Sequence, residues 1–352
     1  MCTPASSTLT QSSPPAAVAA YADATTDVLP IDILQFHILT RLDGPTLAAA
    51  SCASTQLRQL SAPDTMWAGV CRSTWPSTND PRLLELISAF PGGHRSFFSD
   101  SYPHLAVSGQ DSVDAGSLAP AEIISCVDIR HRGKLIFSKA VATETTTAWF
   151  KCSPFRVDML DPKEVVSTPV PYPDTDHACG QLGDCLTLSW IVVDPAGQRA
   201  ANVSSRRSVS VIRHWLSGEV HARFAAVLPG DRRSSSKFVE CGVVVICGGC
   251  RGEDLQVREV SLQVENMDGK FLNGRESLGI LRRALAARRR TPPGGCSEGD
   301  EGRRMHEEFQ RMKMERKERR MRAEGALDMI CAASGLFFLM VPLVLWVLTF
   351  CR

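Results

Sequence analysis

The chain has 352 residues, of which 44% are hydrophobic and 22% are charged, and its formal net charge is +1. These values lie in the ordinary range of folded globular proteins. Because basic and acidic residues balance, the composition gives no support for nucleic-acid binding.

Residues 1–27 form a segment rich in Ser, Thr, Pro and Ala. The segment lacks the basic start and the apolar core of a secretory signal. It also has few large apolar side chains with which to build a packed core. We therefore expect a disordered tail.

Residues 28–76 contain apolar residues at helical spacing, separated by helix breakers. The first helix carries four apolar residues that are three or four positions apart, which are Ile31, Leu34, Ile38 and Leu42. Such spacing predicts one apolar stripe. Gly44 and Pro45 end this helix and begin the next, because proline fits the first turn of a helix. A third apolar face surrounds Trp67.

A module of about 45 residues buries little apolar area by itself, and domains that small usually need a partner. Its apolar stripes therefore predict docking to another protein. The alternative is that the stripes pack against the rest of the chain.

The order of these residues resembles an F-box, the helical docking module of many ubiquitin-ligase subunits. The matching positions are Leu29-Pro30, Asp32-Ile33-Leu34, Ile38-Leu39, Arg41-Leu42-Asp43, Leu47 to Cys52, Leu57-Arg58 and Trp67. The continuation from Cys71 to Ser77 is similar to a subgroup of plant F-box proteins, and later segments extend this resemblance over most of residues 28–285.

The resemblance implies a substrate-recruiting subunit of an SCF-type cullin-RING ubiquitin ligase. A Skp-type adaptor would hold the chain, and the cullin would join through that adaptor. By position, the adaptor-binding residues would be Leu29, Pro30, Ile33, Leu34, Ile38, Leu42 and Leu47.

After the F-box region, residues 77–107 predict a helical extension with a helix at Leu83–Phe90, and residues 108–120 read as a polar linker. Seven runs of strand-like pattern then follow, which are Ile123–Ile129, Lys134–Phe137, Leu186–Val193, Ser208–Val211, Val220–Val227, Phe238–Ile246 and Leu255–Val264. We expect an α+β multidomain chain with a three-helix F-box and a sandwich-like β-rich domain at residues 121–290, the substrate-recognition domain.

The β-rich domain contains one patch with suggestive chemistry, formed by Arg206, Arg207, Arg213 and Trp215. Guanidinium groups bind carboxylate or phosphate in a bidentate way, so the patch is a candidate site for an acidic or phosphorylated target. The alternative for Arg206 and Arg207 is a solvated surface pair. Trp190 and Trp215 are expected to fill the core, with stacking on a sugar as the alternative.

Cysteines do not define a metal site. Cys247 and Cys250 have the spacing of half a zinc site, with Cys241 upstream, but a tetrahedral site needs two further ligands. The nearest candidates have no second paired spacing, and they are Cys179, Cys185 and His177. A turn at Gly248-Gly249 between two strands explains the same residues. No catalytic motif is present, so we expect no cofactor, no metal and no chemistry of the chain's own.

Residues 291–328 are expected to form a linker and a basic helix, in which Met305, Phe309 and Met312 form a thin apolar stripe on an otherwise solvated, lipid-facing helix. Residues 329–351 contain no charged side chain. As a helix they span about 34 Å, enough for a hydrocarbon layer of about 30 Å.

The position of this segment predicts a tail anchor that is inserted after translation. Basic residues beside a span tend to stay cytosolic, so the bulk of the chain would face the cytosol. The sequon at Asn202 would then stay unmodified.

Three functions remain open. The first is a membrane-tethered F-box subunit that recruits an unknown target for ubiquitination. The second is a membrane-tethered binding or scaffold protein outside a ubiquitin ligase, with glycans as one ligand class. The third is an enzyme built on the middle domain, for which only its size and its cysteines argue.

Overall fold

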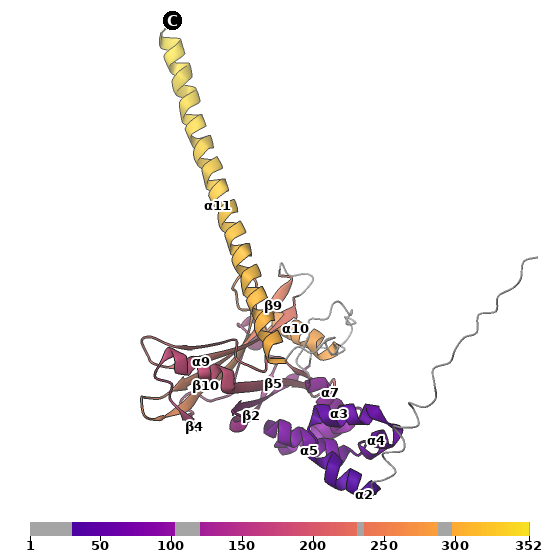
Figure 1. Ribbon diagram of the computed structural model, residues 1–352. Helices are drawn as coiled ribbons and strands as arrows, with labels where there is room; N and C mark the ends of the chain where they lie inside the picture. The colour runs from indigo at the N-terminus through magenta and orange to yellow at the C-terminus, as the bar shows by residue number, and fades with distance from the viewer. Residues whose placement is uncertain (1–29, 103–119, 231–235, 288–297, 352) are drawn as a thin grey trace, which may run out of the picture. The chain divides into compact units, whose positions relative to one another are not determined.

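The computed structural model describes residues 30–102, 120–230, 236–287 and 298–351 (Figure 1). Leu29, the predicted tail at 1–27 and nearly all of the predicted linker at 108–120 lie outside these residues. The chain divides into two compact units after Thr74. A helical first unit, a sheet-rich middle and a long apolar C-terminal helix confirm the α+β class.

The first unit begins with three short helical turns, α2 (Ile31–Ile33), η1 (Leu34–Ile38) and η2 (Leu39–Arg41). The η1 turn is π-helical, and the backbone N–H of Leu39 donates to the carbonyl of Leu34, five residues earlier. A π turn takes more residues than an α turn, so a spacing of three and four no longer marks one face. Leu34 and Leu39 are buried, whereas Ile38 is exposed. The single stripe expected for this segment is therefore wrong.

Three regular helices follow, α3 (Gly44–Ala53), α4 (Thr55–Leu60) and α5 (Asp64–Thr74). The sequence predicted two helices after Gly44 in this unit, and the structure has three. Ser54 explains the difference, because its hydroxyl accepts a hydrogen bond from the N–H of Leu57 at 3.1 Å and so caps a new helix.

Two side chains fix the ends of these helices. Asp43 accepts a hydrogen bond from the N–H of Thr46 at 2.9 Å. Hydrogen bonding by the side chain and then by the backbone of Thr46 lowers the pKa of the Asp43 carboxyl. Trp67 is buried, and its indole N–H donates to the carbonyl of Ser61 at 2.8 Å. The break predicted at Gly44 and Pro45 is confirmed, since α3 begins there.

The second unit begins with η3 (Pro76–Asn79), α6 (Pro81–Ser88) and α7 (Gly93–Ser101). The helix predicted near residue 83 is confirmed as α6. Trp75 is buried against the rings of Phe97 and Phe98, with ring centroids 5.9 and 5.3 Å away. These aromatic contacts hold α7 beside η3.

Two antiparallel sheets form the body of the second unit (Figure 1). The first sheet has the order β2 (Lys134–Glu144), β1 (Glu122–His131), β5 (Leu186–Asp194) and β6 (Arg199–Asn202). The second has the order β3 (Arg156–Asp158), β10 (Asp254–Asn266), β9 (Phe238–Gly248), β8 (Val220–Pro229) and β7 (Ser210–Arg213), and β4 (Val166–Pro171) also pairs with β10.

All seven predicted strands are present, and the sequence missed the short strands β3, β4 and β6. Both sheets contribute side chains to one hydrophobic core, among them Ile129 and Trp190 from the first sheet and Phe224 and Val243 from the second. This two-sheet core is what the expected sandwich-like domain requires. The expectation for Trp190 is confirmed, and its indole N–H donates to Ser125 Oγ at 3.1 Å.

Three helices were not predicted inside this unit, α8 (Ala148–Cys152), α9 (Asp176–Cys185) and α10 (Gly274–Ala286). Asn273 and Glu276 form a capping box at the start of α10. Leu278, Leu281 and Leu285 of α10 join the same hydrophobic core as the sheets.

The last element, α11 (Glu298–Phe350), is one continuous helix of 53 residues (Figure 1). Its first part is not the solvated, lipid-facing helix that the sequence predicted. Phe309 is fully buried and packs with Val227 and Met267 of the second unit. The apolar stripe of this segment therefore covers the unit's own sheet.

Asp128 connects η3 to the first sheet. Its carboxylate accepts hydrogen bonds from the backbone N–H of Ser77 at 3.0 Å, from Ser77 Oγ at 2.5 Å and from Ser138 Oγ at 2.7 Å. Burial raises the pKa of Asp128, and these hydrogen bonds offset only part of that effect. The segment Trp75-Pro76-Ser77 thus brings a serine into hydrogen-bond contact with a buried carboxylate.

We expect the free energy of unfolding to depend on pH through Asp128. A carboxyl whose pKa is raised in the folded state contributes most stability below its ordinary pKa, and this contribution is lost as pH rises through the folded pKa. The stability of the wild type relative to Asp128→Asn should therefore fall from pH 4 to pH 7. Denaturant unfolding of the full chain in detergent, followed by tryptophan fluorescence, measures this difference.

Ser138→Ala provides the matched comparison, because it removes one donor and leaves the carboxyl in place. Loss of this hydrogen bond raises the folded-state pKa of Asp128 further. The stability of Ser138→Ala should therefore fall more between pH 4 and pH 7 than that of the wild type. A relative stability that stays constant or rises with pH would contradict the assignment.

Candidate functional site

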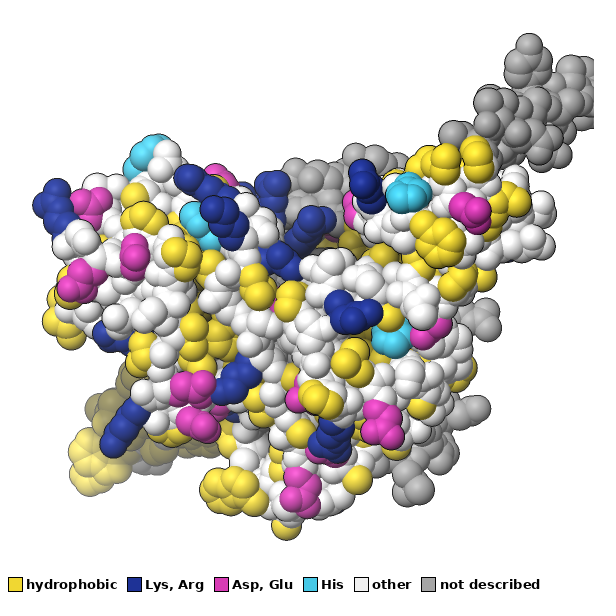
Figure 2. Space-filling view, turned by 90° about the horizontal axis from the view of Figure 1, so that it is seen from below, with side chains coloured by type: hydrophobic (Ala, Val, Ile, Leu, Met, Phe, Trp, Pro, Cys, Tyr) yellow, Lys and Arg dark blue, Asp and Glu magenta, His cyan; other side chains and the backbone are white. Residues whose placement is uncertain are grey.

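The first unit exposes a group of large apolar side chains, Ile31, Ile33, Phe36 and Ile38, which we call the N-terminal apolar surface. Phe36 is 62% exposed, which is unusual for an aromatic side chain in a folded unit. Figure 2 shows hydrophobic side chains gathered on this unit beside histidine and acidic side chains. An apolar centre with a polar rim is the usual composition of a protein interface.

The predicted adaptor-binding residues fall into two groups. Pro30, Ile33 and Ile38 are exposed, and Leu42 is half-buried. Leu34 is buried and Leu47 is 0% exposed, so both fill the core of the unit rather than its surface. Leu29 lies outside the described residues.

Sequence reasoning did not select Phe36 or Ile31 as adaptor-binding residues. Phe36 falls outside the spacing of three and four, and the π turn at η1 brings it to the surface. A large aromatic residue between polar neighbours at Gln35 and His37 was the available signal.

The end of β7 and the loop that joins it to β8 form a second exposed apolar feature, residues 212–219, and we call it the β7–β8 hairpin. Trp215 is 87% exposed, and Leu216 and Ile212 are also exposed. The expectation that Trp215 fills the core is therefore wrong. The loop extends beyond the last paired residues, Arg213 and Val220, and no strand in the described part of the chain pairs with its tip.

Hydrogen bonds order this loop. The N–H of His214 donates to the carbonyl of Glu219 at 2.7 Å, and the N–H of Gly218 donates to the carbonyl of His214 at 2.9 Å. Gly218 has a φ of 71°, a conformation that favours glycine. The Tyr172 hydroxyl also donates to the Gly218 carbonyl at 2.6 Å. The loop thus presents Trp215 on a fixed backbone.

The four residues predicted to bind substrate do not form one site. Arg213 and Trp215 lie at the hairpin, where Arg213 Nη1 donates to the carbonyl of Asp174 at 2.7 Å. Arg206 and Arg207 precede β7 at its other end, where the carbonyl of Arg206 accepts a hydrogen bond from the N–H of Leu188. Arg251, which sequence reasoning missed, pairs with Asp174 at 3.1 Å beside the hairpin.

The cysteines that have the spacing of half a zinc site are divided between core and surface. Cys241 and Cys247 are buried in the core, and Cys250 is exposed. Burial raises the pKa of Cys247 to about 12, which disfavours the thiolate that binds metal. Among the described residues, no three His, Cys, Asp or Glu side chains are grouped to hold a metal ion.

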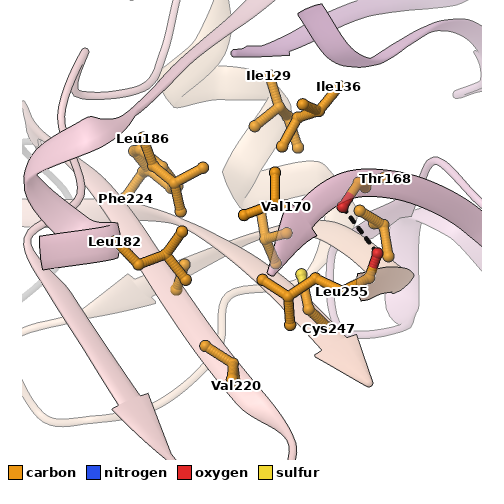
Figure 3. Close-up of a pocket in the computed structure, with 13 residues that line it drawn as sticks. Ile129, Ile136, Thr168, Val170, Leu182, Leu186, Val220, Phe224, Cys247 and Leu255 are labelled. Carbon is orange, nitrogen blue, oxygen red and sulfur yellow. Dashed lines mark hydrogen bonds between the residues drawn. The ribbon is translucent and has the colours of Figure 1, made fainter. Parts of the chain in front are cut away.

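A small cavity lies between the two sheets (Figure 3). Its volume is about 20 Å³, which is close to the room that one water molecule needs. Side chains of both sheets point into it, including Ile129, Leu186 and Phe224 (Figure 3). The Thr168 hydroxyl donates to the carbonyl of Leu255 at 2.7 Å and is thereby satisfied. The cavity is a gap in the packing of the core and is too small for an organic ligand.

Comparison with known proteins finds relatives of most of the chain. No family model and no solved structure matches it. A probable F-box protein of Arabidopsis thaliana is 48% identical over 318 residues, which cover 90% of this chain and 92% of that protein.

Two further F-box proteins of the same plant are 41% and 44% identical. These matches cover 86% and 77% of this chain, and 91% and 76% of the two relatives. The similarity therefore includes the sheet-rich unit as well as the N-terminal helices. This chain belongs to the F-box protein family.

Proposed function

We propose that the chain is the substrate-recruiting subunit of an SCF-type ubiquitin ligase. In this role the first unit binds a Skp-type adaptor, and the cullin joins through the adaptor. The observation that carries the proposal is the N-terminal apolar surface in a chain whose relatives are F-box proteins. The chain itself performs no chemistry, because the complex acts by raising the local concentration of target near a ubiquitin-loaded enzyme.

Exposed apolar side chains on a small helical unit favour this role. Ile33 and Phe36 lose contact with water only when a partner covers them. A few residues in desolvated pockets near the centre supply most of the binding free energy of protein interfaces. We therefore assign adaptor contact to Pro30, Ile33, Phe36 and Ile38, with Leu34 and Leu47 as their core support.

Replacing Ile33 and Phe36 together with alanine should weaken adaptor binding by about 2 kcal/mol, or roughly 30-fold. Co-precipitation of adaptor and cullin with the tagged full chain measures the loss. Trp149→Ala is the control, because Trp149 is 82% exposed and belongs to the second unit. Undiminished recovery with the double variant would contradict the adaptor surface, and no adaptor with the wild type would favour the scaffold function.

The β7–β8 hairpin is our candidate for target recognition. It offers a large aromatic side chain, Trp215, on a hydrogen-bonded loop, so little conformational entropy is lost when a partner binds. Arg213 and Arg251 beside it can pair with acidic groups of a target.

Replacing Trp215 and Leu216 together with alanine should reduce the ubiquitin conjugates that co-precipitate with the chain when the proteasome is blocked. Adaptor recovery should not change, because the hairpin lies in the other unit. Trp149→Ala again serves as the exposed-tryptophan control. Equal conjugates in wild type and double variant would assign recognition to another surface.

We further propose that α11 tethers the chain to a membrane through residues 329–351. In the described part of the chain, residues 301–350 include a window with a mean hydropathy of 2.3, and none of that window is buried. Large apolar side chains without a protein neighbour are stable in lipid and unfavourable in water.

The wild-type chain should stay in the membrane pellet after a carbonate wash. Replacing Leu339 and Leu343 with arginine should release it, since each arginine near the centre of a span costs about 3 kcal/mol. Met321→Arg is the control, because Met321 is an exposed apolar residue of α11 outside residues 329–351. Release of the wild type would contradict the tether.

A further inference from the structure

The first part of α11 is packed onto the outer side of the second sheet. Phe309 is 0% exposed and contacts Val227 of β8 and Met267. Met305 and Met312, one turn before and after Phe309, pack against the same cluster. Side chains alternate along a strand, so Val227 faces away from the core to which Phe224 and Leu228 belong. Without α11 this apolar face would be open to water.

Polar contacts accompany the apolar ones. Glu240 of β9 is 0% exposed, and its Oε2 lies 3.0 Å from His306 Nδ1 and accepts a hydrogen bond from Gln310 Nε2 at 3.2 Å. Its other oxygen pairs with Arg223. Burial raises the pKa of Glu240, but the His306 hydrogen bond and the Arg223 charge outweigh burial and leave the pKa below its usual range. The helix therefore closes over an ionised carboxylate.

Two more ion pairs continue along the same side of the helix. Lys313 Nζ lies 2.5 Å from Glu265 Oε1, and Arg316 Nε lies 2.7 Å from Asp268 Oδ1. The contacting residues recur every three or four positions, so they form one face of α11. We call residues 303–316 the docked segment.

Beyond the docked segment, α11 continues to residue 350 without a break. Residues 317–328 are all exposed, and we call them the stalk. Pairs of opposite charge four residues apart support its helical form, as in Arg320 with Glu324 and Arg322 with Glu318. The stalk has roughly 12 residues, so as a helix it is about 18 Å long.

We propose that α11 holds the sheet-rich second unit at a fixed distance of about 18 Å from the bilayer. The docked segment is part of the sheet-rich unit, and the stalk passes from it into the span as one helix. The targets are then proteins of the same membrane. The segment that the chain recognises in them lies at about this distance from the bilayer. This inference rests on the proposed tether and the proposed recruiting function.

The alternative is a flexible leash. A flexible chain of the same number of residues would let the unit reach in all directions and would admit soluble targets. Gly325 has the weakest helix propensity of the stalk residues, and a Cβ there would meet nothing within 4 Å. Gly325→Ala therefore tests for a hinge without introducing a clash.

Pulsed electron spin resonance on the full chain in nanodiscs tests the proposal. Spin labels on unnatural amino acids at Lys270, beside the docked segment, and Leu327, near the end of the stalk, report one distance. The wild type should give a single narrow distribution, and Gly325→Ala should not change it. A wild-type distribution that is as broad as that of a chain with a Gly-Ser insertion after Lys317, or that narrows in Gly325→Ala, would overturn the rigid stalk.

Docking itself is tested by Phe309→Asp, which places a charge in the apolar cluster and should broaden the distribution. Met314→Asp is the matched control, because Met314 is 61% exposed on the same helix. Unfolding curves show whether Phe309→Asp still folds, and the Gly-Ser insertion decides the question if it does not. A narrow distribution in a folded Phe309→Asp chain would contradict the docked segment.

A separate measurement tests whether the targets are membrane proteins. Ubiquitin conjugates recovered with the wild type under proteasome block should remain in the carbonate-washed membrane pellet. Mainly soluble conjugates would overturn the membrane-target class. Failure of the tether is seen separately, as carbonate release of the chain itself.

Discussion

Burial of two facing sheet surfaces in a single core is the constraint on which the second unit depends. Side chains alternate along each strand, so one set of residues fills the core and the other set needs a different cover. On β8 the core receives Phe224 and Leu228, whereas Val227 lies on the opposite side and is covered by Phe309 of α11. Helix α11 is thereby a layer of the fold as well as an extension of it.

Two buried carboxylates show how distant segments are joined to this core. Asp128 is held mainly by neutral donors from Ser77 and Ser138, and burial raises its pKa. Glu240 is held by His306 and Arg223, and these partners bring its pKa below the usual range despite burial. The buried Glu240 carboxylate stays ionised because hydrogen-bond donors and the Arg223 guanidinium replace the stabilisation that water gave. Each carboxylate thus fixes one element, η3 or α11, in a specific place.

The exposed apolar residues contrast with these buried carboxylates, which have hydrogen-bond partners inside the fold. Phe36 and Trp215 belong to different units, and each is presented by a short ordered turn rather than by a long loop. The π turn at η1 exposes the first, and the hydrogen-bonded loop between β7 and β8 exposes the second. An F-box subunit needs one surface for its ligase and another for its target, and these two features supply candidates for both.

The sequence by itself determined the elements whose signals are local. Periodicity located the seven strands that were predicted, proline and glycine marked the start of α3, and the uncharged run near the C-terminus marked the apolar helix. The order of residues around Leu29-Pro30 and Trp67 was enough to indicate the family. Only the tertiary structure decided which apolar residues are buried, because Leu34 and Ile38 look alike in sequence and a π turn separates them. It also decided the docking of Phe309, since the pairing of His306 with Glu240 joins residues far apart in the chain, and no local pattern records such a contact.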